Sequence, residues 1–149
     1  MPDMLRSDPL AFLRNPRSKK TITVPSETRY IRKVSEKILA SLSGFRLDEG
    51  RVFDIRLCIE EAVRNAIVHG NHSDKHLAVR VTYQVEGERL VIEVEDEGAG
   101  FNHRSVADPT ATAHIMKNSG RGVYLIRKLM DSVAYNDIGN KVTMIKNLK

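Results

Sequence analysis

The stretch from Leu77 to Glu95 constrains the fold most strongly, because apolar and polar residues alternate along it on both sides of a Gly87-Glu88 pair. A period of two is typical of a β-strand that buries one face. The alternation predicts one strand over Leu77 to Glu86 and another over Leu90 to Glu95, joined by a tight turn. We therefore expect an antiparallel hairpin whose alternating apolar residues are Val79, Val81, Tyr83, Val85, Leu90, Ile92 and Val94.

Three other stretches repeat apolar residues every three or four positions, which predicts helices. The first helix is expected to be capped by Ser26 and to end at Gly44. The second is expected to begin at Asp48 and to end at His69-Gly70-Asn71, with Gly70 in the left-handed conformation that terminates many helices. The third follows Gly120-Arg121-Gly122. The periodic apolar residues of the three helices are Ile31, Val34, Ile38 and Leu42; Val52, Ile55, Ile59, Ala62, Val63 and Ala66; and Val123, Ile126, Leu129 and Met130.

Further strands complete the predicted order. Thr21 to Val24 is a β-rich run closed by Pro25, and residues 132–136 and 141–147 are expected to form a final hairpin. The order β, α, α, β, β, loop, α, β, β predicts an α+β fold. It would be a two-layer sandwich in which helices cover one face of a mixed, mostly antiparallel sheet. We expect residues 20–149 to form a single domain and residues 1–19 a flexible basic arm.

Composition narrows the function classes. The chain has 149 residues, 41% of them apolar, which suffices for one hydrophobic core. Its net charge of +5 is scattered except in residues 14–20, so we expect no direct contact with nucleic acid. The apolar residues 9–13 are too few to span a membrane, so we expect a cytoplasmic protein. The single cysteine, Cys58, falls in an apolar helical stretch and is expected to be a buried hydrophobe.

A first candidate site lies on the second predicted helix. Glu61, Asn65 and His69 are spaced by four, which places them on one stripe beside the apolar face. Asn can offer a neutral oxygen to Mg²⁺, and Glu can accept a proton or hold a water molecule. The same stripe can equally be the solvated polar edge of an ordinary helix.

A second candidate is Asp96-Glu97-Gly98-Ala99-Gly100, directly after a predicted strand. A carboxylate at a strand end can accept a hydrogen bond from an exocyclic amine such as that of adenine. Gly98 and Gly100 can let the backbone come close to a flat ligand. The alternative is an ordinary turn, since Asp and Gly are common at the ends of strands.

A third candidate closes the long stretch over residues 98–122, which has no clear period and is of the kind that usually carries function. It ends at Gly120-Arg121-Gly122, where a helix N-terminus with bare N–H groups favours phosphate. Arg121 and Lys117 can add charge-assisted contacts. A flexible hinge before a helix is the alternative. No Gly-Lys-Ser/Thr follows, so this is not a Walker phosphate loop.

The joint order of these segments is more informative than any one of them. A carboxylate–Asn helix, a strand-ending Asp-x-Gly-x-Gly, a mobile loop and a glycine-rich helix start follow one another along the chain. Together they supply a metal ligand, a base reader, a lid and a phosphate cradle. The combination predicts a site that holds ATP with Mg²⁺.

With these motifs the chain resembles the GHKL superfamily of histidine-kinase-like ATPases, and within it the bacterial anti-sigma factor serine kinases. Residues 60–71 are similar to the N box of that family, residues 96–101 to its first glycine box and residues 120–123 to its second. The resemblance covers roughly residues 20 to 147. It implies the Bergerat ATP-binding fold.

The resemblance also implies roles for individual residues. Asn65 would ligate Mg²⁺, Asp96 would read the adenine amino group, and Glu61 would be the general base on an incoming serine hydroxyl. Further contacts with the nucleotide are implied for His69, Gly98, Gly100, Lys117, Gly120, Arg121, Gly122 and Val123.

Kinases of this branch transfer the γ-phosphate of ATP to a serine of a small anti-anti-sigma partner of the STAS fold. They also bind a sigma factor and usually form homodimers, so the resemblance implies a serine kinase that regulates transcription. The same pocket fits a stressosome-type switch kinase, or a non-catalytic module that binds a sigma factor and senses nucleotide. One departure from the family is Gly139-Asn140 in the final hairpin, where the superfamily often has Gly-Thr.

Overall fold

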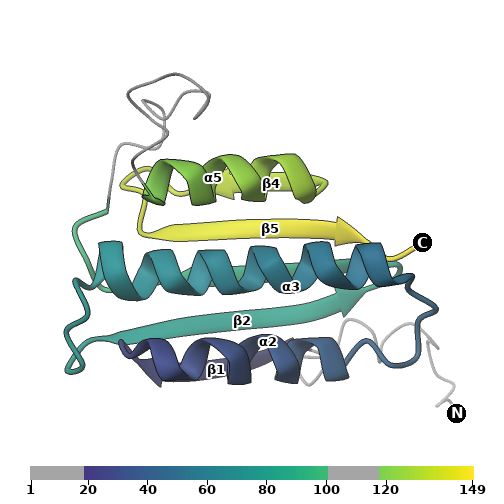
Figure 1. Ribbon diagram of the computed structural model, residues 1–149, viewed down its shortest axis with the longest axis horizontal. Helices are drawn as coiled ribbons and strands as arrows, with labels where there is room; N and C mark the ends of the chain where they lie inside the picture. Colours follow the sequence, from purple (N-terminus) through teal and green to yellow (C-terminus); the bar gives the residue numbers. More distant parts are fainter. Residues whose placement is uncertain (1–18, 101–117) are drawn as a thin grey trace, which may run out of the picture.

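The computed structural model describes residues 19–100 and 118–149, with only the backbone of residues 118–120. Short helical segments, η2 and η3, precede α2 and follow α3. Figure 1 shows the helices packed along the strands of the sheet. The elements in chain order are β1 (Lys19–Pro25), η2 (Thr28–Tyr30), α2 (Ile31–Ala40), α3 (Glu49–Arg64), η3 (Asn65–Gly70), β2 (Ala78–Glu86), β3 (Arg89–Glu95), α5 (Asn118–Leu129), β4 (Ser132–Tyr135) and β5 (Lys141–Asn147).

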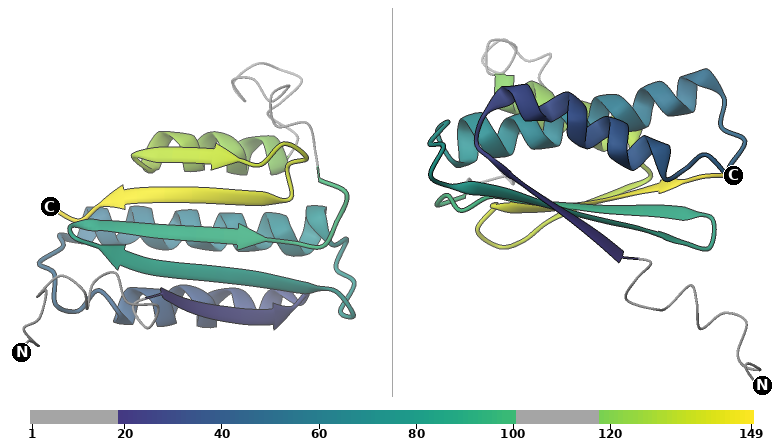
Figure 2. Two further views of the ribbon diagram at one scale, coloured as in Figure 1. Left: turned by 180° about the vertical axis from the view of Figure 1, so that it is seen from behind. Right: turned by 90° about the horizontal axis from the view of Figure 1, so that it is seen from below.

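The strands form one five-stranded sheet in the order β1-β2-β3-β5-β4, and each neighbouring pair is antiparallel. The helices α2, α3 and α5 all lie on the same face of this sheet (Figure 2). The predicted α+β sandwich is therefore confirmed. The register sets Val81 opposite Val94, and Val94 opposite Val142, so one row of β-branched side chains crosses the sheet beneath the helices.

The core lies between this row and the apolar face of α3. Ile55, Ile59 and Val63 of α3 are fully buried, as are Val81 and Ile92 of the sheet. Burying each such side chain stabilises the fold by about 1.5–3 kcal/mol, so α3 is the helix that the core depends on most. Its N-terminus is fixed by the Asp48 side chain, which accepts a hydrogen bond from the Arg51 N–H (2.7 Å), as predicted for that position.

Cys58 belongs to the same core. Its side chain is 1% exposed, and burial raises the pKa of its thiol to about 12. The thiolate is thus suppressed at physiological pH, and the thiol behaves as a small hydrophobe, as predicted.

The two predicted ends of the first helix were wrong. Ser26 does not cap it, because the buried Ser26 hydroxyl donates a hydrogen bond to the Leu77 carbonyl (2.7 Å) and accepts another from Asn71. The 3-10 turn η2 intervenes, and α2 begins only at Ile31. It ends at Ala40, four residues before Gly44.

Other predicted boundaries also moved. Gly70 is not left-handed; His72 (φ 52°) and Ser73 (φ 57°) are. The helix α5 begins at Asn118, before Gly120 rather than after Gly122. Lys19, assigned to the arm, is the first residue of β1, and the rest of the predicted arm lies outside the described residues. No helix within residues 19–100 and 118–149 is both long and apolar enough to cross a membrane.

Candidate functional site

The end of α3 changes its helical geometry at Asn65. Residues 65–70 form the π-helical segment η3, and the Asn71 N–H donates to the carbonyl of Ala66, five residues earlier (2.8 Å). π turns inside longer helices frequently mark functional sites. This wider turn displaces the residues after Asn65 from a strict α-helical stripe, so the equal spacing of Glu61, Asn65 and His69 does not give them equal environments.

Two neighbouring cavities meet at this turn. Asn65 and His69 line both of them, while Glu61 lines the outer one. Glu61 and Asn65 are half-buried, and His69 is exposed. The polar stripe predicted from sequence therefore lies along the boundary between two cavities rather than on an open helix surface.

The inner pocket has a volume of about 110 Å³ and lies between the α3–η3 junction, α5 and the sheet. Most of its wall is apolar, with Ala62 and Ala66 from the helical side and Val94 and Val142 from the sheet. Val123, the last residue of the predicted second glycine box, is 2% exposed and closes the pocket from α5. Such a slot suits a flat, largely apolar ring.

Asp96 is the acidic residue among those that line the inner pocket. It is 9% exposed, and burial raises the pKa of its carboxyl above the usual range for Asp. The Gly98 N–H donates to Asp96 Oδ1 (2.8 Å), while the Asp96 backbone N–H donates to the Asn140 carbonyl (2.9 Å). A carboxylate is therefore fixed in an apolar pocket, where a hydrogen-bond donor on a ligand would be bound strongly.

Glycines make room for this carboxylate. A Cβ on Gly70 would lie 2.2 Å from Asp96 Oδ2, and a Cβ on Gly98 would lie 2.0 Å from the Gly70 carbonyl oxygen. Gly100 has φ +85°, and a Cβ there would lie 1.8 Å from the Ile138 carbonyl oxygen. The glycines of the predicted first box thus permit contacts between backbone segments of the protein, and Gly100 also lines the inner pocket.

The outer groove has a volume of about 450 Å³ and lies between the α3–η3 junction and the N-terminal half of α5. Glu61, Arg64, Arg121 and Gly122 line it, together with Asn65 and His69 at its inner end and Val68 and Leu125. A Cβ on Gly122 would lie 2.8 Å from Asn65 Nδ2 and 2.9 Å from Glu61 Oε2. Gly122 therefore lets α5 approach the two polar side chains of α3 and η3 closely.

The earlier start of α5 changes how the second glycine box is interpreted. Gly120 lies in the first turn of α5, where backbone N–H groups lack partners within the helix, whereas Arg121 and Gly122 lie beyond those first N–H groups. Of the predicted phosphate-binding residues, Gly120 keeps a location at the helix N-terminus, the Arg121 side chain lines the outer groove, and Gly122 instead allows a close helix–helix contact. Lys117 lies outside the described residues.

Comparison with known proteins identifies the family of this chain. Residues 24–146 match the model of the histidine kinase-like ATPase domain. The chain belongs to this family.

Named relatives narrow the family further. The chain is 31% identical to the serine-protein kinase RsbW of Bacillus subtilis over 84% of its own length and 82% of the relative's. It is 28% identical to RsbW of Listeria monocytogenes over 86% of each chain. It is also 30% identical to the anti-sigma F factor of Clostridium kluyveri, over 80% of its own length and 84% of the relative's.

A solved structure agrees with the fold. The crystal structure of the RsbU and RsbW domains of Rv1364c from Mycobacterium tuberculosis aligns with a TM-score of 0.54 at 18% identity. The alignment covers 88% of this chain and 32% of that one, so the chain spans about a third of that larger protein. At this identity the likeness extends to the fold alone.

The histidine kinase-like ATPase domain of this chain contains a buried network that sequence reasoning missed. Asn71 is 1% exposed and donates to Ser26 Oγ (2.9 Å) and to the Ala78 carbonyl (3.0 Å). Its Oδ1 accepts from the Glu97 N–H (2.8 Å), and Glu97 Oε2 accepts from the Ala78 N–H (2.5 Å). The network joins the end of η3 and the start of β2 to the segment that follows Asp96. A polar residue directly after a helix-ending glycine was the available signal.

Two further residues at the two cavities were also missed. Arg64 lines the outer groove and donates from Nη1 to Glu61 Oε1 (3.2 Å). Tyr135 lines the inner pocket, and the Arg127 guanidinium lies over its ring, 5.7 Å from the ring centre. Burial raises the pKa of Tyr135 to about 12. The three-residue spacing of Glu61 and Arg64 was the signal for that pair, whereas nothing local identifies Tyr135.

The side chains at the junction of the two cavities fit Mg²⁺ only if a bound ligand supplies further oxygen atoms to the metal. Asn65 presents a carboxamide there, and no hydrogen bond joins that carboxamide to another described residue. Within residues 19–100 and 118–149, no group of three or more His, Cys, Asp or Glu side chains could hold a metal ion. Mg²⁺ accepts one or two protein oxygens when phosphates and water supply the others. Asn65 therefore suits a magnesium ion that arrives with a polyphosphate.

Replacing Asn71 by Ala should lower the free energy of unfolding by about 2–4 kcal/mol, because the buried Asn71 side chain forms three hydrogen bonds and its removal takes one partner from the buried Ser26 hydroxyl. Urea denaturation followed by circular dichroism measures this. Asn147→Ala is the matched control, since that side chain is exposed and its backbone hydrogen bond to Asp131 survives the change. Equal midpoints for the two variants would mean that the Asn71 network does not hold the Asp96 segment.

Proposed function

We propose that the protein is an ATP-dependent serine kinase that binds a sigma factor and phosphorylates a serine on a STAS-type anti-anti-sigma partner. One observation carries the proposal. The buried Asp96 carboxylate lies in an apolar pocket, which continues past Asn65 into a groove that contains Glu61. A ligand that fills both cavities needs a flat amine-bearing ring at one end and anionic groups at the other, as ATP has.

The adenine ring is proposed to fill the inner pocket. Its amino group would donate to the carboxylate of Asp96, and its faces would contact Ala62, Val94 and Val123. Asn140 supports this end of the pocket, because its Nδ2 donates to the Asp96 carbonyl (3.3 Å) and its own carbonyl accepts from the Asp96 N–H. Asn in place of the family's Thr can therefore still hold the Asp96 backbone in position.

The triphosphate is proposed to lie in the outer groove. The first turn of α5 offers backbone N–H groups, Arg121 offers a guanidinium, and Asn65 would ligate Mg²⁺. When bound there, Mg²⁺ would supply charge neutralisation, which is a main requirement of phosphoryl transfer. His69, exposed at the mouth of both cavities, is available to contact the nucleotide between base and phosphates.

Glu61 is proposed to be the general base. Its Oε1 accepts from Arg64, and its Oε2 faces Gly122 across the groove. The serine hydroxyl would give its proton to Glu61 as its oxygen bonds to the γ-phosphorus and ADP leaves. A well-positioned base contributes about 10²–10⁴-fold to rate.

The proposal extends to the partners and the cellular location. Proteins similar to this chain include serine-protein kinases and an anti-sigma F factor. We assign to this chain a STAS partner as substrate, a sigma factor as binding partner, a homodimeric state and a cytoplasmic location. The test is a kinase assay with purified protein, Mg-[γ-³²P]ATP and the STAS protein encoded nearest to it. Label transferred to a serine supports the kinase, whereas nucleotide binding without transfer indicates a non-catalytic sensor.

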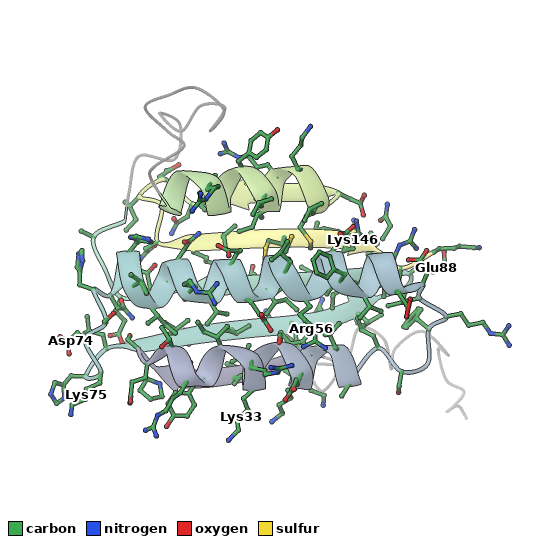
Figure 3. The ribbon with its side chains drawn as sticks, viewed as in Figure 1. Lys33, Arg56, Asp74, Lys75, Glu88 and Lys146 are labelled. Atoms are coloured by element: carbon green, nitrogen blue, oxygen red, sulfur yellow. The ribbon has the colours of Figure 1, made fainter. Side chains whose placement is uncertain are left out.

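Glu61→Ala should keep its affinity for ATP while its phosphorylation rate falls by about 10²–10⁴-fold, because only proton transfer is lost. Calorimetry measures the first quantity and the kinase assay the second. Glu60→Ala is the matched control, because the Glu60 side chain contacts α2 instead of lining the groove. Glu60 Oε2 accepts from Ser35 Oγ of α2 (2.6 Å) and lies 3.8 Å from Arg56 Nη1. Figure 3 shows Arg56 between α3 and α2. Loss of ATP affinity in Glu61→Ala as large as the loss in rate would assign Glu61 a structural role.

Asp96→Asn should abolish ATP binding, because it sets an amide donor against the amino group of adenine. The same variant should be at least as stable as the wild type at pH 7. Burial raises the pKa of Asp96 in the folded state, so ionisation opposes folding at every pH above that raised value, and Asn removes this cost. Calorimetry and thermal denaturation separate the two effects. Undiminished ATP affinity would rule out Asp96 as the reader of adenine.

Asn65→Ala should bind ATP equally weakly in magnesium and in EDTA, because the variant lacks the oxygen that ties the metal to the protein. The wild type should bind ATP at least about tenfold more tightly in magnesium than in EDTA. Titration calorimetry under both conditions provides the comparison. A variant that keeps the full magnesium effect would show that the metal is held without Asn65.

A further inference from the structure

Arg64 lines the outer groove, and none of the sequence motifs described above assigns it a role. It lies on the last turn of α3, three residues after Glu61, and its Nη1 lies 3.2 Å from Glu61 Oε1. The Arg64 side chain is 46% exposed and that of Glu61 is 21% exposed. An exposed pair of this kind adds little to the stability of a fold. Its location inside the groove therefore calls for a functional explanation.

The guanidinium has donors beyond the one that it uses. A guanidinium presents several N–H groups in a planar fork, and Nη1 is the Arg64 nitrogen that the described residues engage. The other donors lie on a side chain that lines the outer groove, as does Arg121 of α5. Arg64 can thus keep Glu61 and hold a second anion at the same time.

The chemistry of the groove creates a need for such a bridge. If the terminal phosphate of a nucleotide enters the groove, it comes into the same space as the Glu61 carboxylate, and the two negative charges repel each other. A guanidinium between two anions converts this repulsion into two charge-assisted hydrogen-bond contacts. Lys would be a poorer bridge, because a single ammonium lacks the planar fork.

We infer that Arg64 bridges Glu61 and the terminal phosphate of bound ATP, and so makes the groove discriminate nucleoside triphosphate from diphosphate. The inference rests on the proposed function, since it requires ATP in the two cavities. ADP has no third phosphate to reach Arg64, so its binding depends on the inner pocket and the first turn of α5.

The experiment is a calorimetric titration of the full chain with Mg-ATP and, separately, with Mg-ADP, in the absence of any protein substrate. Arg64→Ala should weaken ATP binding by about tenfold and ADP binding by less than about twofold. Arg64→Lys should fall between wild type and Arg64→Ala for ATP. Arg32→Ala is the matched control, because Arg32 forms an equally short, exposed pair with Glu36 (3.2 Å) on α2, and it should leave both affinities unchanged.

An unchanged ratio of ATP to ADP affinity in Arg64→Ala would overturn the inference, and so would an equal loss for both nucleotides. A wild type that binds neither nucleotide would overturn the proposed function itself, which is a different result. Should Arg64→Ala denature at a lower temperature than Arg32→Ala, Arg64→Gln provides the comparison with the side-chain length largely kept. The inference then requires the same selective loss of ATP affinity in that variant.

Discussion

The carboxylate of Asp96 is kept almost out of water, and the backbone around it closes so tightly that glycine is required at two positions. Gly70 leaves no room for a side chain beside Asp96 Oδ2, and Gly98 leaves none beside the Gly70 carbonyl. A buried carboxylate is costly unless it is paired or receives hydrogen bonds. Within the described part of the chain, Gly98 supplies one such bond to Asp96 Oδ1. The remaining acceptor capacity of Asp96 is available to a donor in the inner pocket, and burial raises the pKa of the carboxyl because that single bond compensates it only in part.

The rest of the domain holds three distant segments around that carboxylate. The Asn71 network joins the end of η3 to the start of β2 and to the backbone of Glu97. Asn140 joins the β4–β5 hairpin to Asp96 from the other side. Because these links are buried or partly buried hydrogen bonds that share residues, they stabilise the pocket most when all of them are satisfied together. The shape of the inner pocket is therefore set by hydrogen bonds within the protein.

Sequence periodicity predicted the parts of the molecule that depend on local pattern. The alternation around Gly87 identified the β2–β3 hairpin, and the four-residue spacing of Glu61 and Asn65 identified one wall of the outer groove. It failed where the partner of a residue is remote in the chain. Ser26 bonds to Leu77 rather than to its own helix, and Asn71 bonds across the fold. A Ser or Asn side chain can cap a helix or form a hydrogen bond to a remote segment, and its spacing in the sequence does not distinguish the two roles.

The glycines illustrate the same limit more sharply. A pattern of glycines next to Asp96 is compatible with backbone contact to a ligand or with contact to another backbone segment. The structure assigns Gly98 to the second purpose, because the Gly70 carbonyl lies where its side chain would be. Gly122 was expected to leave a backbone N–H group free for phosphate. In the structure, its lack of a side chain makes room for Asn65 and Glu61. The two glycine motifs lie beside the two cavities, but the reason for each glycine depends on tertiary contacts.

The two ends of α5 carry opposite partial charges and meet different groups of the protein. At its C-terminus, Lys146 Nζ donates to the Leu129 carbonyl (2.6 Å), and Figure 3 shows Lys146 at that end of the helix. A cation there stabilises the negative end of the helix dipole. The positive end remains at the outer groove, where Arg121 adds to it and Gly122 brings it close to Asn65 and Glu61. One end of α5 therefore interacts with a cation of the protein, while the other lies at the groove beside the Glu61 carboxylate, where an entering phosphate would meet the positive end of the helix dipole.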